Sequence, residues 1–266
     1  MLFEKSSWEK FYAYKSALRC SKRFTKELRE YIDSEAYLKY AAEIKSCTNL
    51  PLPTKSVISK MSSRKKRTVY KYPYEFNMVL KLLTFLTLRK YDHIYSPDLY
   101  SFRPGVCAKD AITRICRTRE LHTLYSYKID VSDYFNSIPV DRICNILDDT
   151  ITDDVDLLNF LKALLNEKYV ISDYEKVAEK KGIMAGTPIA SFYANLYLKD
   201  LDEWFRDRGI LYARYSDDII VFAKNEEEIE SEKEEERLRI LRRGPDLDCF
   251  LEGRRRTLVS YSAVPV

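Results

Sequence analysis

The chain has 266 residues, of which 45% are hydrophobic and 32% are charged, and this balance excludes wholesale disorder. Its formal net charge of +4 is unevenly distributed. Four successive segments, residues 1–50, 51–125, 126–225 and 226–266, carry +3, +10, −6 and −3, and such asymmetry bears on binding partners more than on fold.

Several function classes are excluded by what the sequence lacks. The 6 cysteines form no C-x-x-C pair and only 2 histidines accompany them, which argues against a structural zinc site. Neither a G-x-S-x-G sequence nor a G-x-G-x-x-G or G-x-x-x-x-G-K-[ST] loop occurs. No secretory signal and no apolar run of about 20 residues is present, so we expect a cytoplasmic protein with reduced thiols and no membrane partner.

The first third of the chain is expected to be helical and then to become extended. Apolar side chains recur at near-helical spacing over residues 8–45, and the Pro-containing segment 48–53 ends this region. In residues 57–72, basic side chains lead into a β-branched and aromatic run, which predicts a strand or a hairpin with a basic tip. Residues 74–90 are again predicted to be a helix.

The middle of the chain predicts more helices and one strand. A helix is expected over residues 108–119, and residues 124–131 have the pattern of a strand that ends in an acidic turn. Pro139 suits the first position of a helix, and residues 155–170 have helical character. Residues 189–205 predict a single long helix.

The last clear feature is a strand, a turn and a second strand over residues 210–222. Residues 226–236 predict an acidic helix or a solvated tail, and neither a helical nor a strand period is sustained after Gly244.

Three aspartates form a candidate site for chemistry. Asp217 and Asp218 occupy the predicted hairpin turn, where glycine or asparagine is the usual choice, and their mutual repulsion is a cost that a divalent cation offsets. Asp130 also ends an apolar strand, so the three carboxylates converge if these strands are neighbours. Two Mg²⁺ ions about 3.5–4 Å apart, held by such oxygen ligands, promote phosphoryl transfer. The alternative is a solvated acidic turn, with Asp130 as a helix cap.

Five ordered segments of the chain resemble the motifs of reverse transcriptases. The two upstream segments, residues 67–73 and 101–111, look like the fingers motifs of bacterial members, which include retron, group II intron and phage-defence types. The other three look like palm motifs, and they are KIDVSDYFNSI at residues 128–138, GIMAGTPIASFYANLYL at 182–198 and YSDD at 215–218. The resemblance covers roughly residues 50–225.

The resemblance implies an RNA-directed DNA polymerase with an RNA template and a DNA or RNA primer. Such an enzyme adds dNTPs to a primer 3′-hydroxyl with two Mg²⁺ ions, for which Mn²⁺ can substitute. The implied fold is α+β, a right-hand polymerase whose palm is an antiparallel sheet packed on helices. The implied domains are a helical N-terminal extension (1–50), basic fingers (51–125), an acidic palm (126–225) and an acidic helix with a poorly specified tail (226–266).

Individual residues acquire expected roles from the resemblance. Asp130 and Asp217 match the metal-binding aspartates, and Asp218 matches the second acid of the hairpin, so all three are expected to be catalytic and to bind metal. The other expected roles are nucleotide binding by Arg67, Phe135 and Gly186, and template or primer contact by Arg103, Ser191 and Asn195. Phe135 would exclude a ribose 2′-hydroxyl.

Other interpretations stay open beside these roles. Phe135 also fits an ordinary core aromatic, and residues 102–105 also fit a packing corner. Met184-Ala185 replaces the usual Pro-Gln of the family loop, which removes a polar contact. Nothing after Gly244 resembles a primer grip or a thumb, so no thumb is expected, and a truncated or frame-disrupted gene product is one hypothesis. The alternative function is a catalytically inactive RNA-binding palm remnant or defence-system component.

Overall fold

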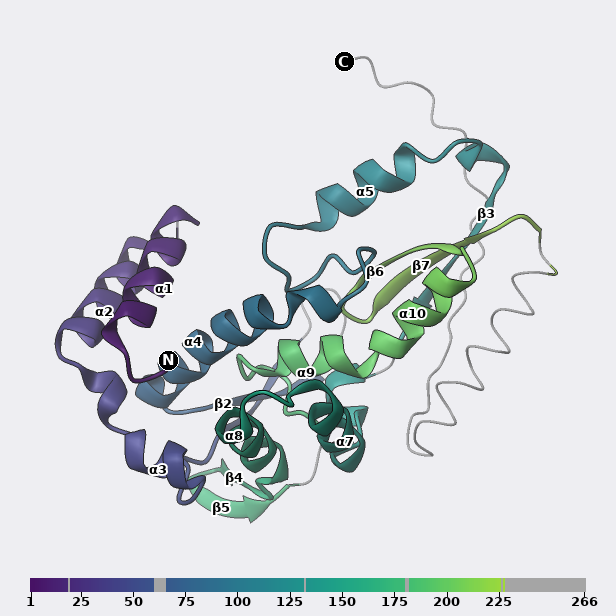
Figure 1. Ribbon diagram of the computed structural model, residues 1–266. Helices are drawn as coiled ribbons and strands as arrows, with labels where there is room; N and C mark the ends of the chain where they lie inside the picture. The colour runs from purple at the N-terminus through teal and green to yellow at the C-terminus, as the bar shows by residue number, and fades with distance from the viewer. Residues whose placement is uncertain (19, 60–65, 132, 180–181, 226, 228–266) are drawn as a thin grey trace. The chain divides into compact units, whose positions relative to one another are not determined.

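The computed structural model describes residues 1–18, 20–59, 66–131, 133–179, 182–225 and 227 (Figure 1). It divides into two compact units, each formed by two separate stretches of chain. Unit 1 comprises residues 1–87 and 140–193, and unit 2 comprises residues 88–139 together with what is described from residue 194 onward. These units cut across the expected extension, fingers and palm segments, so that functional division stays a prediction.

Unit 1 combines helices with a four-stranded sheet. Its helices are α1 (Lys5–Ala17), α2 (Lys22–Asp33), η1 (Ala36–Leu38), α3 (Ala41–Ser46), α4 (Tyr74–Lys90, whose last residues enter unit 2), α7 (Val140–Thr150) and α8 (Val155–Asn166). Its strands are β1 (Thr54–Ser59), β2 (Lys66–Lys71), β4 (Tyr169–Ser172) and β5 (Glu175–Ala178).

The N-terminal helices are held by an aromatic core. Trp8 is 0% exposed, and its ring lies 5.3 Å from that of Tyr37 and 5.2 Å from that of Tyr31. Ser21 caps α2 by accepting a hydrogen bond from the Phe24 amide at 3.2 Å. Burial of this apolar stripe confirms the helical region predicted over residues 8–45, although it is divided into several helices.

The sheet of unit 1 has the strand order β2-β1-β4-β5. β1 and β2 pair antiparallel from Thr54 opposite Lys71 to Ser59 opposite Lys66, which confirms the predicted hairpin. The expected basic tip was Arg64 to Arg67; Arg64 and Lys65 lie outside the described residues, whereas Lys66 and Arg67 begin β2. β4 joins β1 in parallel through Thr54 and Ile171, and β5 pairs antiparallel with β4.

Unit 2 contains a three-stranded antiparallel sheet of order β3-β7-β6. The strands are β3 (Tyr125–Asp130), β6 (Leu211–Tyr215) and β7 (Asp218–Ala223). Its helices are η2 (Asp92–Ile94), α5 (Ala108–Cys116), η3 (Leu121–Thr123), α6 (Tyr134–Ser137), α9 (Ala190–Tyr197, which begins in unit 1) and α10 (Lys199–Asp207). α10 runs beside β6 (Figure 1), and the whole is an α+β fold with sheets packed on helices.

The single helix predicted over residues 189–205 is wrong, because α9 and α10 are separated at Leu198. Leu198 has a ψ of 8°, outside the helical range, and serves as the N-cap residue of α10. α9 is apolar and buried, whereas α10 buries one face with Leu201, Trp204 and Phe205. Apolar periodicity continues through the junction, so the break gave no signal of its own.

The helix predicted over residues 155–170 is too long by four residues, since α8 ends at Asn166 and β4 begins at Tyr169. The hairpin of β4 and β5 was not predicted. Its two turn residues, Asp173 and Tyr174, have φ values of 50° and 67°, the left-handed pair of a type I′ turn. The usual Asn-Gly signal of such a turn is missing, because a tyrosine occupies the glycine position.

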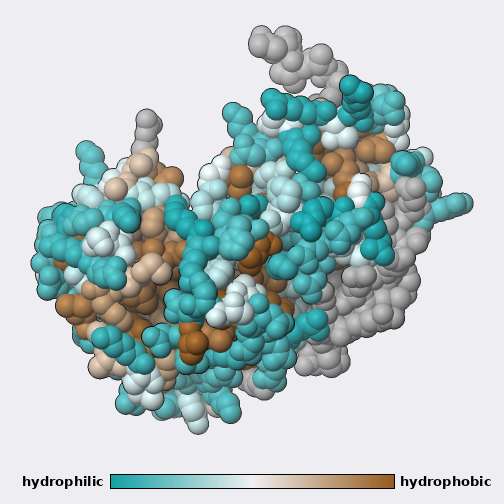
Figure 2. Space-filling view, in the orientation of Figure 1, coloured by the Kyte–Doolittle hydropathy of each residue, from teal (hydrophilic) through white to brown (hydrophobic). Residues whose placement is uncertain are grey.

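The surface seen in Figure 2 is predominantly hydrophilic, with smaller hydrophobic patches between the charged side chains. Individual exposed apolar residues, such as Ile112 and Val155, are normal for a folded protein. Among the helices that the structure describes, none is long and apolar enough to cross a membrane.

Candidate active site

The strand register places two of the three candidate aspartates opposite each other in the sheet of unit 2. β3 and β7 pair antiparallel, and the register sets Asp130 opposite Asp218. The strands are anchored by buried apolar residues, among them Ile129, Ile219 and Val221. The condition under which the aspartates meet, that the strand ending at Asp130 lies beside the hairpin, is therefore fulfilled, while the roles of the aspartates stay predictions.

The turn between β6 and β7 consists of only two residues, Ser216 and Asp217, since Tyr215 pairs with Asp218. Ser216 has a φ of 63°, a left-handed conformation that costs a residue with a side chain about 1–2 kcal/mol. Asp217 is half-buried, and Asp218 is exposed and forms an ion pair with Lys128 on β3. The two adjacent carboxylates thus have different surroundings.

A buried ion pair lies directly under this turn. Arg214 on β6 and Asp202 on α10 are each 1% exposed. Arg214 Nε donates to Asp202 Oδ1 at 2.8 Å and to Oδ2 at 3.1 Å, and Nη2 also donates to Oδ2. Burial raises the pKa of the Asp202 carboxyl, and the permanently charged guanidinium opposes that rise.

Sequence reasoning missed this pair. A charged residue among apolar neighbours in each element could have indicated it. Asp202 lies between Leu201 and Trp204 on the buried face of α10. Arg214 lies among the buried residues of β6. Fully buried charges are rare unless they are paired, so the two positions point to each other.

Phe135 lies on α6, the short helix that follows β3. Its neighbour Tyr134 is 2% exposed and donates a hydrogen bond from its hydroxyl to the Ala194 carbonyl at 2.6 Å. The rings of Tyr134 and Phe135 meet edge to face, with centroids 5.5 Å apart. Phe135 itself is only partly buried. Tyr134 is therefore the core aromatic of this helix, and it fixes the backbone from which Phe135 extends.

The side chains of Arg103 and Asn195 both form hydrogen bonds within the protein. Arg103 forms a two-point ion pair with Asp92, with Nε–Oδ1 and Nη2–Oδ2 distances of 2.8 and 3.1 Å, and donates to the carbonyls of Ser96 and Leu99. These contacts make it the clamp of a packing corner. Asn195 is 0% exposed, and its Nδ2 donates to the backbone of the neighbouring 96–101 segment. Template contact by either residue stays a prediction.

The remaining candidates, Arg67, Gly186 and Ser191, belong to unit 1. Arg67 is exposed on β2, and Ser191 Oγ donates to the Pro188 carbonyl at 3.1 Å. Gly186 has a φ of 97°, and a Cβ there would lie 3.1 Å from the Tyr70 carbonyl oxygen. In this structure the glycine thus permits a close approach to the backbone of β2. The nucleotide-binding roles of Arg67 and Gly186 stay predictions.

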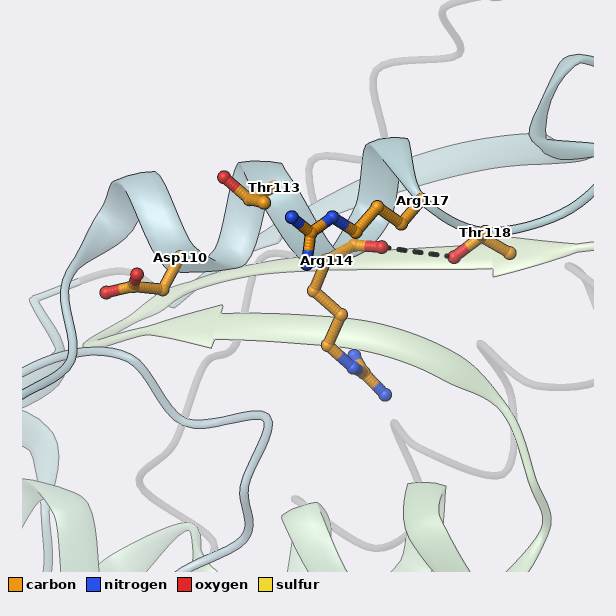
Figure 3. Close-up of a pocket in the computed structure, with 5 residues that line it drawn as sticks. All are labelled: Asp110, Thr113, Arg114, Arg117 and Thr118. Carbon is orange, nitrogen blue, oxygen red and sulfur yellow. Dashed lines mark hydrogen bonds between the residues drawn. The ribbon is translucent and has the colours of Figure 1, made fainter.

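An open depression on α5 (Figure 3) is lined by five side chains, those of Asp110, Thr113, Arg114, Arg117 and Thr118. Arg114 extends from the helix toward β6, where it pairs with Asp98 and donates to the Tyr212 carbonyl at 3.1 Å. The Thr118 hydroxyl donates to the Arg114 carbonyl at 3.4 Å. Arg114 is thus used to hold α5 against β6.

The chemistry of the aspartates fits a hard divalent cation. Carboxylate oxygens are the ligands that Mg²⁺ prefers, with waters and phosphate oxygens completing its octahedron. Within the described part of the chain no group of three or more His, Cys, Asp or Glu side chains is gathered closely enough to hold a metal ion, and the Asp130 side chain is outside that description. Asp218 is paired with Lys128, and metal binding by Asp130, Asp217 and Asp218 stays a prediction.

Solved structures define the class of this fold as the fingers and palm of a right-hand polymerase. Telomerase from Candida albicans, in complex with a TWJ fragment of telomeric RNA, matches with a TM-score of 0.55 and 10% identity, covering 80% of this chain and 45% of that chain. Apo telomerase from Candida tropicalis, truncated from its C-terminal domain, matches with a TM-score of 0.53 and 10% identity over 76% of this chain and 51% of that chain. At such low identity the likeness concerns the fold alone.

The chain belongs to the family described as reverse transcriptase (RNA-dependent DNA polymerase), which matches residues 58–243, more than half of its length. A curated relative, the "Putative COX1/OXI3 intron 2 protein" of Saccharomyces cerevisiae, is 25% identical over 118 residues, which are 44% of this chain and 14% of that protein. The chain therefore spans only a small part of this relative and about half of the telomerase chains.

Proposed function

We propose that the protein is an RNA-directed DNA polymerase. The observation that carries the proposal is the register of β3 and β7, which sets Asp130 opposite Asp218, the residue that follows Asp217 in the chain, in a member of the reverse transcriptase family. In the reaction, the primer 3′-hydroxyl attacks the α-phosphate of a dNTP in line and pyrophosphate leaves.

The aspartates have separate roles in this proposal. Asp130 and Asp217 hold Mg²⁺, which when bound lowers the pKa of the attacking hydroxyl and neutralises charge on the phosphates. Asp218 is paired with Lys128, so it tunes the charge at the edge of the sheet rather than providing a second full ligand. Mn²⁺ is the expected substitute ion.

The substrate contacts are likewise proposals. Arg67, exposed on β2, offers a permanent charge and bidentate donors to a triphosphate. Phe135, partly buried after β3, excludes a ribose 2′-hydroxyl. The motifs at residues 67–73 and 101–111 support placing the chain among the bacterial retron, group II intron or phage-defence lineages.

Primer extension by the purified protein tests the proposal. The assay uses a polyriboadenylate template, an oligodeoxythymidine primer, dTTP and Mg²⁺. We expect extension by the wild type and a loss of at least about a thousandfold in Asp217→Asn, since one uncharged ligand disables charge stabilisation of the transition state. Asp207→Asn is the matched control, because that carboxylate is 68% exposed on α10.

The outcomes separate the two functions considered for the chain. Extension that persists in folded Asp217→Asn would refute the metal assignment. RNA binding by the wild type in a gel shift, with a salt-dependent affinity but no Mg²⁺-dependent extension, would instead identify a non-catalytic RNA-binding protein.

A further inference from the structure

The guanidinium of Arg214 contacts both the turn and its surroundings. Nη1 donates to the Ser216 carbonyl at 3.2 Å, and Nη2 donates to the Asn195 carbonyl at 3.3 Å, in addition to the bonds with Asp202. One buried side chain therefore links β6, α9 and α10 to the residue that precedes Asp217.

The other side of the turn is held by the segment that leads to α5. The Ser216 amide donates to Ser101 Oγ at 2.7 Å, and the Ser101 carbonyl accepts from Asn195 Nδ2 at 3.1 Å. The same segment is also bonded to the backbone of Arg214. The Arg214 amide donates to the Asp98 carbonyl, and the Arg214 carbonyl accepts from the Tyr100 amide, both at 2.9 Å. Both backbone polar groups of Ser216 are thus bonded to residues outside the turn.

This arrangement is costly if stability is its only purpose. Removing two charges from water has a free-energy cost that their attraction must offset, and buried ion pairs are often replaced by apolar residues without loss of stability. The ion pair is bonded, through Arg214, to Ser216, the left-handed residue directly before Asp217. Fixing Ser216 fixes the direction in which the Asp217 side chain is presented.

We propose that Arg214 and Asp202, with Ser101, are positioning residues for Asp217, an inference that rests on the proposed polymerase function. Arg214 orients the turn through the Ser216 carbonyl, Ser101 orients it through the Ser216 amide, and Asp202 orients Arg214. None of the three contacts substrate in this role, and their effect reaches the metal through Asp217.

The central test is the double variant Asp202→Leu/Arg214→Met. It replaces the ion pair by apolar side chains of similar volume, so no unpaired buried charge remains and the fold is expected to survive. We expect a urea unfolding midpoint close to that of the wild type, kcat for primer extension lower by about 10–100-fold, and an apparent Mg²⁺ affinity weakened over the same range. Wild-type kcat and Mg²⁺ affinity in the folded double variant would overturn the proposal.

Hydrogen exchange measures how well the Ser216 amide is protected, independently of enzymatic activity. In the wild type the Ser216 amide is bonded to Ser101 Oγ, and we expect its protection to fall by at least about tenfold in the double variant while the other amides of β6 and β7 remain protected. Unchanged protection at Ser216 overturns the proposal even if activity falls. If the wild type itself extends no primer, the proposed function fails, and hydrogen exchange still shows whether the network holds the turn.

Two single variants decide the matter if the double variant does not fold. Ser101→Ala removes the acceptor of the Ser216 amide and leaves the ion pair intact, so we expect lower protection and about tenfold lower kcat. Ser96→Ala is the matched control, because this buried serine lies in the same segment and its hydroxyl accepts from the Asp98 amide and the Tyr212 hydroxyl, not from the turn. Across these variants, kcat is expected to correlate with the exchange protection of the Ser216 amide. If kcat correlates with the free energy of unfolding instead, the residues stabilise the fold and do not position Asp217.

Discussion

Replacing Gly186 by alanine tests whether the loop before α9 is held by its close approach to β2. Gly186 has a φ of 97°, and a Cβ would lie 3.1 Å from the Tyr70 carbonyl oxygen, 3.2 Å from Val69 Cβ and 3.4 Å from the Tyr70 amide nitrogen. Two of these neighbours are backbone atoms, and the Tyr70 amide is itself bonded to the Ala185 carbonyl at 2.8 Å. The strand therefore has no flexible side chain that could move aside.

The expected cost follows from two separate effects. A left-handed backbone costs a residue with a Cβ about 1–2 kcal/mol, and overpacking at a rigid contact costs about 1–3 kcal/mol. The lower entropy of the unfolded alanine chain offsets about 0.4–1 kcal/mol of this. We therefore expect Gly186→Ala to lower the free energy of unfolding by about 1–5 kcal/mol, with the middle of that range at about 3 kcal/mol.

Gly209→Ala is the matched control for backbone conformation alone. Gly209 has a φ of 64°, and a Cβ there would meet no atom within 4 Å, so only the left-handed cost of about 1 kcal/mol applies. Both variants are unfolded in urea and followed by far-ultraviolet circular dichroism. Because the chain has 2 tryptophans, a Trp204→Phe background leaves Trp8, buried in unit 1 with Gly186, as a fluorescent reporter. If Gly186→Ala costs no more than Gly209→Ala, the close approach is not what the glycine provides.

Two further predictions concern residues with proposed substrate roles. Phe135→Ala is expected to raise incorporation of ribonucleotides relative to deoxynucleotides by at least about tenfold in single-nucleotide extension assays, since the proposed barrier to the 2′-hydroxyl is removed. Unchanged discrimination would contradict the gate, and Phe135→Tyr, which keeps a bulky ring at this position, is its control. Arg103→Gln is expected to lower the free energy of unfolding by about 1–3 kcal/mol in urea, because the partly buried bonds to Asp92 and to the Ser96 and Leu99 carbonyls are lost. Asp92→Asn should have an effect of similar size, and a change in RNA affinity without a change in stability would instead favour template contact.

The sequence predicted elements whose periodicity is strong and local. The helix over residues 74–90 and the strands on both sides of the YSDD turn were located to within a residue or two, because apolar spacing and turn position are both visible in one stretch of chain. The β4–β5 hairpin was not predicted, since an Asp-Tyr turn hides the left-handed backbone that it adopts. The division of the helix at Leu198 was missed for the same reason: its backbone differs from that of its neighbours while its apolar character does not.

For a related reason, some site residues are easier to predict from the sequence than others. Acidic residues at strand ends stand out against apolar neighbours, so Asp130, Asp217 and Asp218 could be selected and their shared edge inferred. Asn195 and Arg103 were selected as polar residues in motifs, but their side chains are bonded to neighbouring backbone within unit 2. A motif specifies which residue is present, whereas burial and partners depend on segments far away in the chain.

The YSDD turn also illustrates a conflict between local preference and site chemistry. A two-residue hairpin turn is most stable with glycine or asparagine in its left-handed positions, but a turn that presents a carboxylate must give one of its two positions to aspartate. Here the left-handed position is filled by Ser216, with a φ of 63°, rather than by glycine. The conformation is consequently supported by bonds from Ser101 and Arg214. The turn should therefore be no more rigid than the segment that carries Ser101 and the strand β6 that carries Arg214. A change at Asp202 on α10 should reach Asp217 through Arg214, without altering any residue of the motif.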